Sequence, residues 1–178
     1  MPLSRLFSKW CKKLNNSAEI HYFEPIGELY NQARINLWNN NNIYFNNYWI
    51  AEKSTTEKIF FNPEKTTQSS KYKSFLNPNW VEVVVNFISL KEYLEQGNVS
   101  KIDVLKMDIE WMEFEIFNSR CNYERWMLNN LISEIHLLNR EMESERNKLF
   151  PKIKNIFWDV KIINSWYRNE IFLLRARK

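Results

Sequence analysis

The sequence predicts an α/β domain with a mostly parallel sheet and a C-terminal antiparallel hairpin. Strand-like apolar runs alternate with segments of helical period over most of the chain, and this alternation is typical of parallel sheets covered by helices. The last two strand-like runs are separated by a connector that is short enough for a hairpin. The chain has 178 residues, of which 44% are hydrophobic, and this size suits one domain with a sizeable core. We therefore expect a single domain over residues 1–178.

The amino-terminal segment, residues 1–17, predicts an amphipathic helix. Its apolar residues recur at spacings of three and four, at Leu3, Leu6, Phe7, Trp10 and Leu14. We expect this stripe to pack on the domain, because such stripes most often face a core. A membrane anchor is the less favoured alternative. A secretory signal would need a continuous apolar stretch, and serine and lysine residues interrupt this segment.

The next five segments predict strands and one helix. A strand over 19–25 ends at a proline, which cannot continue a hydrogen-bonded ladder. The helical period over 26–38 is followed by an asparagine cluster, and a second strand is expected over 43–51. Residues 58–61 predict a strand beside a long polar loop, and the β-branched run 80–90 predicts another strand.

The rest of the chain continues the alternation. Ser89 and Gly97 bracket a short helix, as a possible N-cap and as the residue just past its end. After it we expect a strand, a helix, a strand, a helix and a closing pair of strands. Their ranges are 101–109, 111–117, 131–137, 139–154, 155–165 and 169–177.

Charge and aromatic content say little about partners. The formal net charge is +4 and the isoelectric point is about 9.0, but the Lys and Arg residues are spread along the chain rather than clustered. Nucleic-acid binding through the 8 Trp and 8 Tyr residues is the weakest of the hypotheses, because most of these rings fall at core-facing positions. We expect no nucleic-acid partner.

The cysteine pattern favours a reducing compartment, and the hydropathy predicts no membrane span. Cys11 and Cys121 are the 2 cysteines, they lie far apart, and no CxxC pair is present. Free thiols are therefore expected, and a structural zinc site is not. No apolar run reaches the ~18 residues of a transmembrane helix. We expect a cytoplasmic protein without a membrane span.

Two carboxylates follow the strand predicted at 101–109. Asp108 and Glu110 fall where this strand runs out, and ligands of parallel sheets bind beyond the carboxyl ends of the strands. Carboxylates at this place can accept hydrogen bonds, act as a general base or hold a divalent cation. The alternative is structural, since acids in the first turn of a helix cap its free N–H groups.

The same stretch carries a resemblance to a known family. IDVLKMDIE (102–110) resembles the signature strand of FkbM-type methyltransferases, I-D-x-L-K-x-D-x-E followed by Gly. Three other segments agree in order with that family: YFEPIGELYNQARINL, WVEVVVNFISLKEYLEQGNVSKID and ISEIHLL. The E-I-H form of the last one resembles a subgroup of animal methyltransferase-like proteins. The similarity extends from about Glu19 to Arg175.

The resemblance implies a Rossmann-like class I methyltransferase fold that binds S-adenosylmethionine. By this resemblance, Glu24 in the F-E-P motif with Pro25 takes the ribose hydroxyls, and Ile50 and Ala51 lie near the adenine. From the residues alone, an acid that caps the following helix is an equal alternative for Glu24.

The resemblance also implies the catalytic residues. Asp108 and Glu110 would lie by the sulfonium and the methyl acceptor, a small molecule or a glycan of unknown identity. Glu134 and His136 end the next strand, where they would position the acceptor or a metal. For His136 alone, a satisfied half-buried side chain is the more common role. No metal is expected as a cofactor.

Two departures from the family leave the activity of this chain open. No glycine precedes Glu19, so the family's first strand and its glycine-rich D-x-G-x-x-x-G loop have no counterpart. Partner chains or the amphipathic amino-terminal helix are the two alternatives for covering the sheet edge that this exposes. Trp111 stands where the family has Gly. The sequence thus predicts an O-methyltransferase dependent on S-adenosylmethionine, or alternatively an inactive domain of the same fold that serves in binding or as a scaffold.

Overall fold

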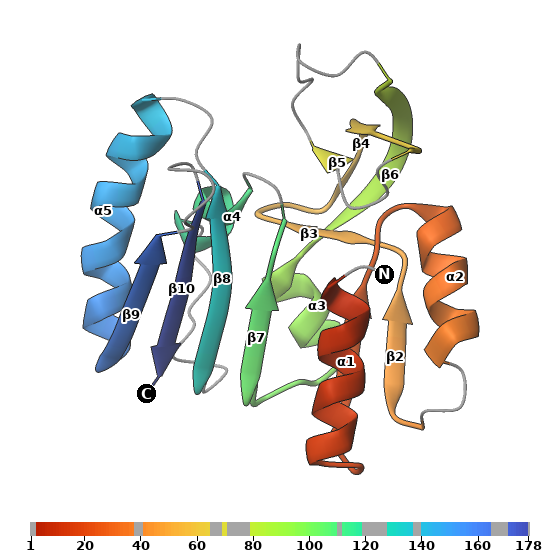
Figure 1. Ribbon diagram of the computed structural model, residues 1–178, viewed down its shortest axis with the longest axis horizontal. Helices are drawn as coiled ribbons and strands as arrows, with labels where there is room; N and C mark the ends of the chain where they lie inside the picture. Colours follow the sequence, from red (N-terminus) through yellow and green to blue (C-terminus); the bar gives the residue numbers. More distant parts are fainter. Residues whose placement is uncertain are drawn as a thin grey trace. The chain divides into compact units, whose positions relative to one another are not determined.

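The strands that the structure describes belong to three small sheets, which Figure 1 shows together with the five helices that carry labels there. The computed structural model describes residues 3–37, 41–64, 69–70, 79–109, 112–118, 128–136, 140–164 and 171–177. It describes the backbone alone at 3–6, 69–70, 118, 136, 140–143, 163–164 and 171–177. The chain divides into two units, Met1–Ile88 and Ser89–Lys178.

A parallel strand pair joined by a helix forms one part of the first unit. Strands β1 (Ile20–Phe23) and β2 (Ile43–Asn46) pair in parallel, with Ile20 opposite Ile43. Helix α2 (Gly27–Leu37) connects them and contacts β2. A crossover helix is what a parallel pair requires. The helix buries three residues at the spacing of one face, Leu29, Ala33 and Leu37.

The second sheet of this unit has the strand order β3-β6-β4-β5. The bounds are β3 Trp49–Ala51, β4 Thr55–Phe61, β5 Ser69–Ser70 and β6 Val81–Ser89. Strand β4 runs antiparallel to both β5 and β6. The strands alternate in burial, because Ile59 and Val85 are buried while the cross-strand pair Lys58–Glu82 forms an exposed salt bridge of 2.9 Å.

The strand predicted at 43–51 is in fact two strands in different sheets. Strand β2 ends at Asn46, and β3 begins at Trp49. The Asn46 amide donates to the carbonyls of Tyr22 (3.2 Å) and Tyr44 (3.0 Å), and the Asn47 amide donates to two further carbonyls that follow β1. These side chains satisfy backbone groups where the ladder stops, so the chain can leave one sheet and enter the other.

The amino-terminal segment forms a helix, as predicted, but two residues of its apolar stripe are exposed. Helix α1 (Leu3–Leu14) buries Ser8 and Lys12, which are 4% and 7% exposed. On its apolar side, Trp10 is 55% exposed and Leu14 is 66% exposed. The Lys12 ammonium donates to the backbone carbonyls of Asn16 at 3.0 Å and Ala18 at 2.8 Å, which lie just past the end of the helix. Because its charge is satisfied by these oxygens, the lysine can be buried in place of the apolar stripe.

The thiol of Cys11 is free, as predicted for this residue. It is half-buried in α1, and burial raises its pKa above the ordinary value. The side chain therefore stays a protonated thiol at neutral pH. Cys121 lies outside the described residues.

The second unit is built on one four-stranded sheet with the order β7-β8-β10-β9. The bounds are β7 Val104–Met107, β8 Asn130–His136, β9 Asp159–Asn164 and β10 Ile171–Arg177. Strands β7 and β8 are parallel, whereas β10 lies between β8 and β9 and runs antiparallel to both (Figure 1). The predicted closing antiparallel pair is thus confirmed, and its last strand is inserted next to β8.

Helices α3, α4 and α5 complete this unit, over Leu90–Gln96, Glu113–Asn118 and Arg140–Ile156. The predicted caps of α3 are confirmed, since the Ser89 hydroxyl accepts from Glu92 N at 3.1 Å and Gly97 is the C-cap. Helices α4 and α5 contact each other, and they contact β8 and β9, respectively. The core consists mainly of apolar residues from these elements: Met112, Ile116, Leu128, Leu131, Ile135, Leu149 and Ile153.

The predicted α/β class is confirmed, and several predicted boundaries and pairings differ. Parallel pairing is described for β1–β2 and β7–β8, while four other pairs are antiparallel. The strand predicted at 101–109 is limited to Val104–Met107, and residues 155–156 end a helix rather than begin a strand. Within the described ranges, none of the helices combines the length and the apolar character needed to cross a bilayer.

The core of the second unit allows a stability test. Leu131 in β8 is fully buried, whereas Val104 in the neighbouring β7 is 44% exposed. We expect Leu131→Ala to lower the free energy of unfolding by about 2–5 kcal/mol through lost burial and a cavity, and Val104→Ala by less than about 1 kcal/mol. Urea unfolding followed by circular dichroism measures both. Equal losses would contradict the described core.

His21 makes stability depend on pH. Its ring is half-buried in β1 and stacks on Tyr44 with 4.9 Å between centroids. Burial lowers its pKa below the ordinary 6.5, while Glu19 acts in the opposite direction. Since the unfolded chain takes up the proton at higher pH than the folded chain, stability should fall as pH decreases through about 6.5 and towards the folded pKa.

The His21 midpoint can be measured by proton NMR. We expect it below 6.5, and we expect His21→Gln to flatten the pH dependence of the unfolding midpoint in this range. A midpoint above 6.5 would show that the ring is not desolvated as described.

Candidate functional site

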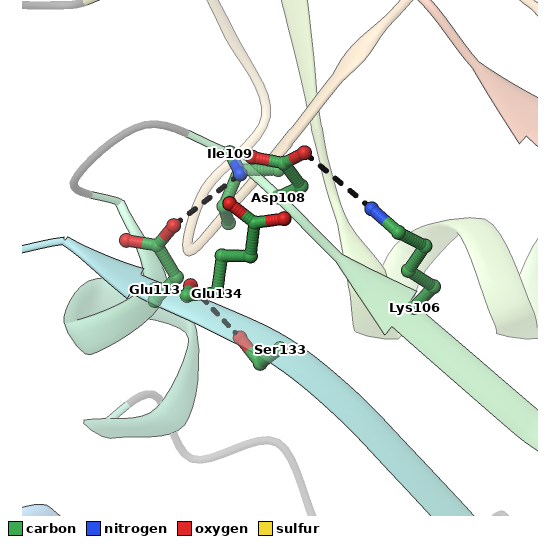
Figure 2. Close-up of polar contacts among 6 residues, drawn as sticks. All are labelled: Lys106, Asp108, Ile109, Glu113, Ser133 and Glu134. Atoms are coloured by element: carbon green, nitrogen blue, oxygen red, sulfur yellow. Dashed lines mark hydrogen bonds and ion pairs between the residues drawn. The ribbon is translucent and has the colours of Figure 1, made fainter. Parts of the chain in front are cut away.

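Two carboxylates lie at the carboxyl end of the parallel pair β7–β8. In the register of this pair Met107 is opposite Ser133, so Asp108, which follows β7, is level with Glu134 in β8. Met107 and Ser133 are both buried. Because side chains alternate along strands, Asp108 and Glu134 share the opposite face of the sheet, and parallel neighbours are only about 4.8 Å apart. Figure 2 shows both side chains at this place.

Lys106 provides a cation on the same face. Its Nζ lies 3.4 Å from Oδ2 of Asp108, and the two side chains are 18% and 30% exposed. Lys106 and Asp108 are two residues apart on one strand, which is the spacing that puts side chains on one face. The ammonium therefore orients the carboxylate and supplies a donor beside it (Figure 2).

Glu113, which the sequence analysis did not single out, determines the turn after β7. It is the first residue of α4 and is 0% exposed. Its Oε1 accepts a hydrogen bond from Ile109 N at 3.3 Å (Figure 2). This bond ties the residue after Asp108 to the helix start. The signal in the sequence was an acid in the first turn of the helix expected at 111–117, but a local pattern does not show that this acid is buried or that it bonds to Ile109 N.

Strand β8 provides the other wall of this site. Ser133 is fully buried, and its hydroxyl donates to the Glu134 carbonyl at 3.2 Å. Glu134 is half-buried on the face that Asp108 occupies. His136 is the last residue of β8, and its backbone alone is described. Glu110 and Trp111 lie outside the described residues.

A third acid marks the opposite end of β7. Asp103 accepts from Lys101 at 2.7 Å and from the Asn129 amide at 3.2 Å. The hydrogen bond from Lys101 holds the pKa of Asp103 below its ordinary value. This carboxylate precedes the strand instead of following it, so it belongs to the edge where ligands of parallel sheets do not bind.

In the first unit, Glu24 stands at the carboxyl end of β1. Its Oε1 accepts from Ile26 N at 3.1 Å, and its backbone N–H donates to the Asn46 carbonyl at 3.1 Å. The Asn47 amide donates to the carbonyls of Glu24 and Pro25 at 2.8 and 3.0 Å. The capping role that the sequence left open is thus observed for one carboxylate oxygen. The same bonds hold the carboxylate at the strand end.

An apolar groove adjoins this strand end. It has a volume of about 530 Å³ and begins at Pro25, Ile26 and the first turn of α2. Its other wall comes from the sheet of β4 and β6: Phe61, Pro63, Val81, Val83, Val84 and Val85. Ile50 and Ala51, expected near an adenine, are buried in β3, which belongs to that same four-stranded sheet and not to the β1–β2 pair.

The chemistry of the described side chains is that of carboxylates and one amine. Over the described part of the chain, no three residues among His, Cys, Asp and Glu are grouped so that they could hold a metal ion. Asp108, Glu134 and Lys106 can bind hydroxyl groups and accept or hold a proton. Glu24 can accept hydrogen bonds from two neighbouring hydroxyl groups.

Comparison with known proteins identifies the family. The methyltransferase FkbM domain matches residues 4–160, which is most of the chain and includes all of the acids described above. No curated protein and no solved structure matches the chain. The family match agrees with the resemblance carried by residues 102–110. The chain therefore belongs to the FkbM methyltransferase domain family.

Proposed function

We propose that this protein is a methyltransferase dependent on S-adenosylmethionine that methylates a hydroxyl group, on a Rossmann-like fold. The observation that carries the proposal is the FkbM family match over residues 4–160. The carboxylates at the carboxyl ends of β1 and β7 support it, because ligands of parallel strands bind beyond these ends. The cofactor supplies an electrophilic methyl group on its sulfonium when it is bound.

The residues of the first unit fit the cofactor that the family implies. Glu24 is held at the end of β1 by the bond from Ile26 N, and the two oxygens of a carboxylate match a vicinal diol such as that of a ribose. Pro25 is held in place through the Asn47 amide. We assign the ribose to Glu24 and Pro25, and the adenine to the neighbourhood of Ile50 and Ala51.

The residues of the second unit would act on the acceptor. Asp108 is exposed and oriented by Lys106, so it can accept the proton that an acceptor hydroxyl loses during methyl transfer. Glu134 lies beside it and can hold the hydroxyl by a hydrogen bond. Glu110 and His136 are proposed to position the acceptor. Most of the rate would come from orientation, because a bound hydroxyl has a much higher effective concentration than a free one.

A second candidate function is a binding or scaffold domain without methyl transfer. It is favoured by the glycines, since the 2 in the sequence both stand at helix ends, Gly27 at the start of α2 and Gly97 at the C-cap of α3. Neither has a positive φ. A loop that brings backbone N–H groups close to a ligand commonly uses glycines with a positive φ. Cofactor binding and turnover distinguish the two functions.

Glu24 allows a direct test of cofactor binding. We expect calorimetry to detect S-adenosylmethionine binding to the whole chain, and Glu24→Gln to weaken it by about tenfold or more, because one charge-assisted bond is lost. The glutamine keeps an oxygen that can cap Ile26 N. Glu19→Gln, at the exposed residue just before the other end of β1, is the matched control and should bind normally. No heat at millimolar cofactor would remove the proposal.

Asp108 allows a separate test of catalysis. In an assay that measures S-adenosylhomocysteine release with a panel of hydroxyl acceptors, Asp108→Asn should lower kcat by about 10²-fold or more. Asp103→Asn, at the other end of the same strand, should have little effect. Cofactor binding without turnover in the unmodified protein would favour the scaffold function. Equal losses in both variants would show that Asp108 has no special role.

A further inference from the structure

We propose that helix α1 docks this protein on an anionic lipid surface. The inference is independent of the methyltransferase proposal, because it concerns a helix face that the candidate site does not use. The observation is the inverted packing of this helix. It buries Ser8 and Lys12 and leaves Trp10 and Leu14 exposed, which is the opposite of what a surface helix of a soluble domain usually does.

The exposed apolar residues form one continuous stripe. Phe7, Trp10 and Leu14 are three and four residues apart, so they lie on one face of the helix. The rings of Phe7 and Trp10 are in contact, with 5.9 Å between their centroids. Phe7 is half-buried beside the two exposed side chains. Trp is well suited to a bilayer surface, since its ring is apolar and its N–H can reach water or a headgroup.

The charges of α1 indicate which surface it fits. Lys9 and Lys13 are exposed, and at 100° per residue their row lies between the buried face and the apolar stripe. The helix sequence LSRLFSKWCKKL contains no acidic residue. A strongly amphipathic helix with Trp and Leu on one side and lysines beside them is the pattern of helices that lie in the bilayer interface, where anionic headgroups attract the cations.

A second copy of the chain fits this face less well. In a symmetric dimer the same patch meets itself, so two helices with exposed lysines and no acids would be brought together. The like charges would then oppose the contact. An anionic membrane has the opposite charge and needs no shape complementarity beyond an apolar layer. The observations therefore favour lipid over self-association.

The first experiment is co-sedimentation of the whole protein with phosphatidylcholine vesicles, with and without phosphatidylserine. We expect binding to the vesicles that contain phosphatidylserine. The double variant Trp10→Ser/Leu14→Ser should bind them about tenfold or more weakly, because the lost apolar area is what enters the bilayer. Its charge is unchanged, so any attraction that depends only on the basic isoelectric point remains. Trp158→Ser is the matched control, since Trp158 is 74% exposed outside this helix, and it should bind normally.

A second experiment does not depend on the folding of the double variant. Trp10→Phe keeps an apolar ring and should retain binding. Brominated lipids should quench tryptophan fluorescence in the unmodified protein and distinctly less in Trp10→Phe. Absence of binding to phosphatidylserine vesicles, equal binding of the double variant, or equal quenching in both proteins would overturn the proposal. A dimer in sedimentation equilibrium that requires Trp10 would overturn it as well, and would assign the face to a second copy.

Discussion

The parallel pairing of β7 with β8 is the constraint on which the placement of Asp108 and Glu134 depends. This register places Met107 opposite Ser133, and both residues are buried. A shift of one residue would exchange the two faces of a strand, so that Asp108 would turn inwards and the acids would no longer share a face. Burial of apolar residues on one side of the sheet thus determines where the carboxylates are on the other.

In each unit, polar side chains satisfy the backbone groups at the ends of strands. Asn46 and Asn47 donate to backbone carbonyls where β1 and β2 end, and Glu24 and Glu113 each accept from a backbone N–H after their strand. A strand end leaves backbone groups that must be paired. An acid placed there has a structural function already, and this function holds it where a ligand of a parallel sheet would bind. The structural and the functional explanations of these acids are therefore compatible.

Helix α1 shows how a satisfied charge changes the packing of an amphipathic helix. Burial of Lys12 is tolerated because its ammonium reaches two carbonyl oxygens just past the helix. Without such partners a buried ammonium is strongly unfavourable. With the lysine on the covered side of the helix, Trp10 and Leu14 lie on the exposed side.

The sequence by itself determined the fold class, the family and most of the elements. The caps of α3, Ser89 and Gly97, and the segments that became β1, α2, β4, β6, β8 and α5 were predictable, because capping and periodicity are local properties. The strand-end positions of Glu24 and Asp108 were also predictable, since each of these acids follows an apolar run.

Only the tertiary structure decided the division of the run 43–51 between two sheets, the burial of Glu113 and the outward face of α1. Each of these depends on which polar groups the folded backbone brings within hydrogen-bond reach, and a hydrophobic period does not contain that information. The amides of Asn46 and Asn47 end a ladder only because carbonyls of β1 are in reach, and Lys12 can be buried only because Ala18 O is close. Partners of this kind come from the folded chain, so a periodic pattern identifies the helix but does not decide which of its faces is covered.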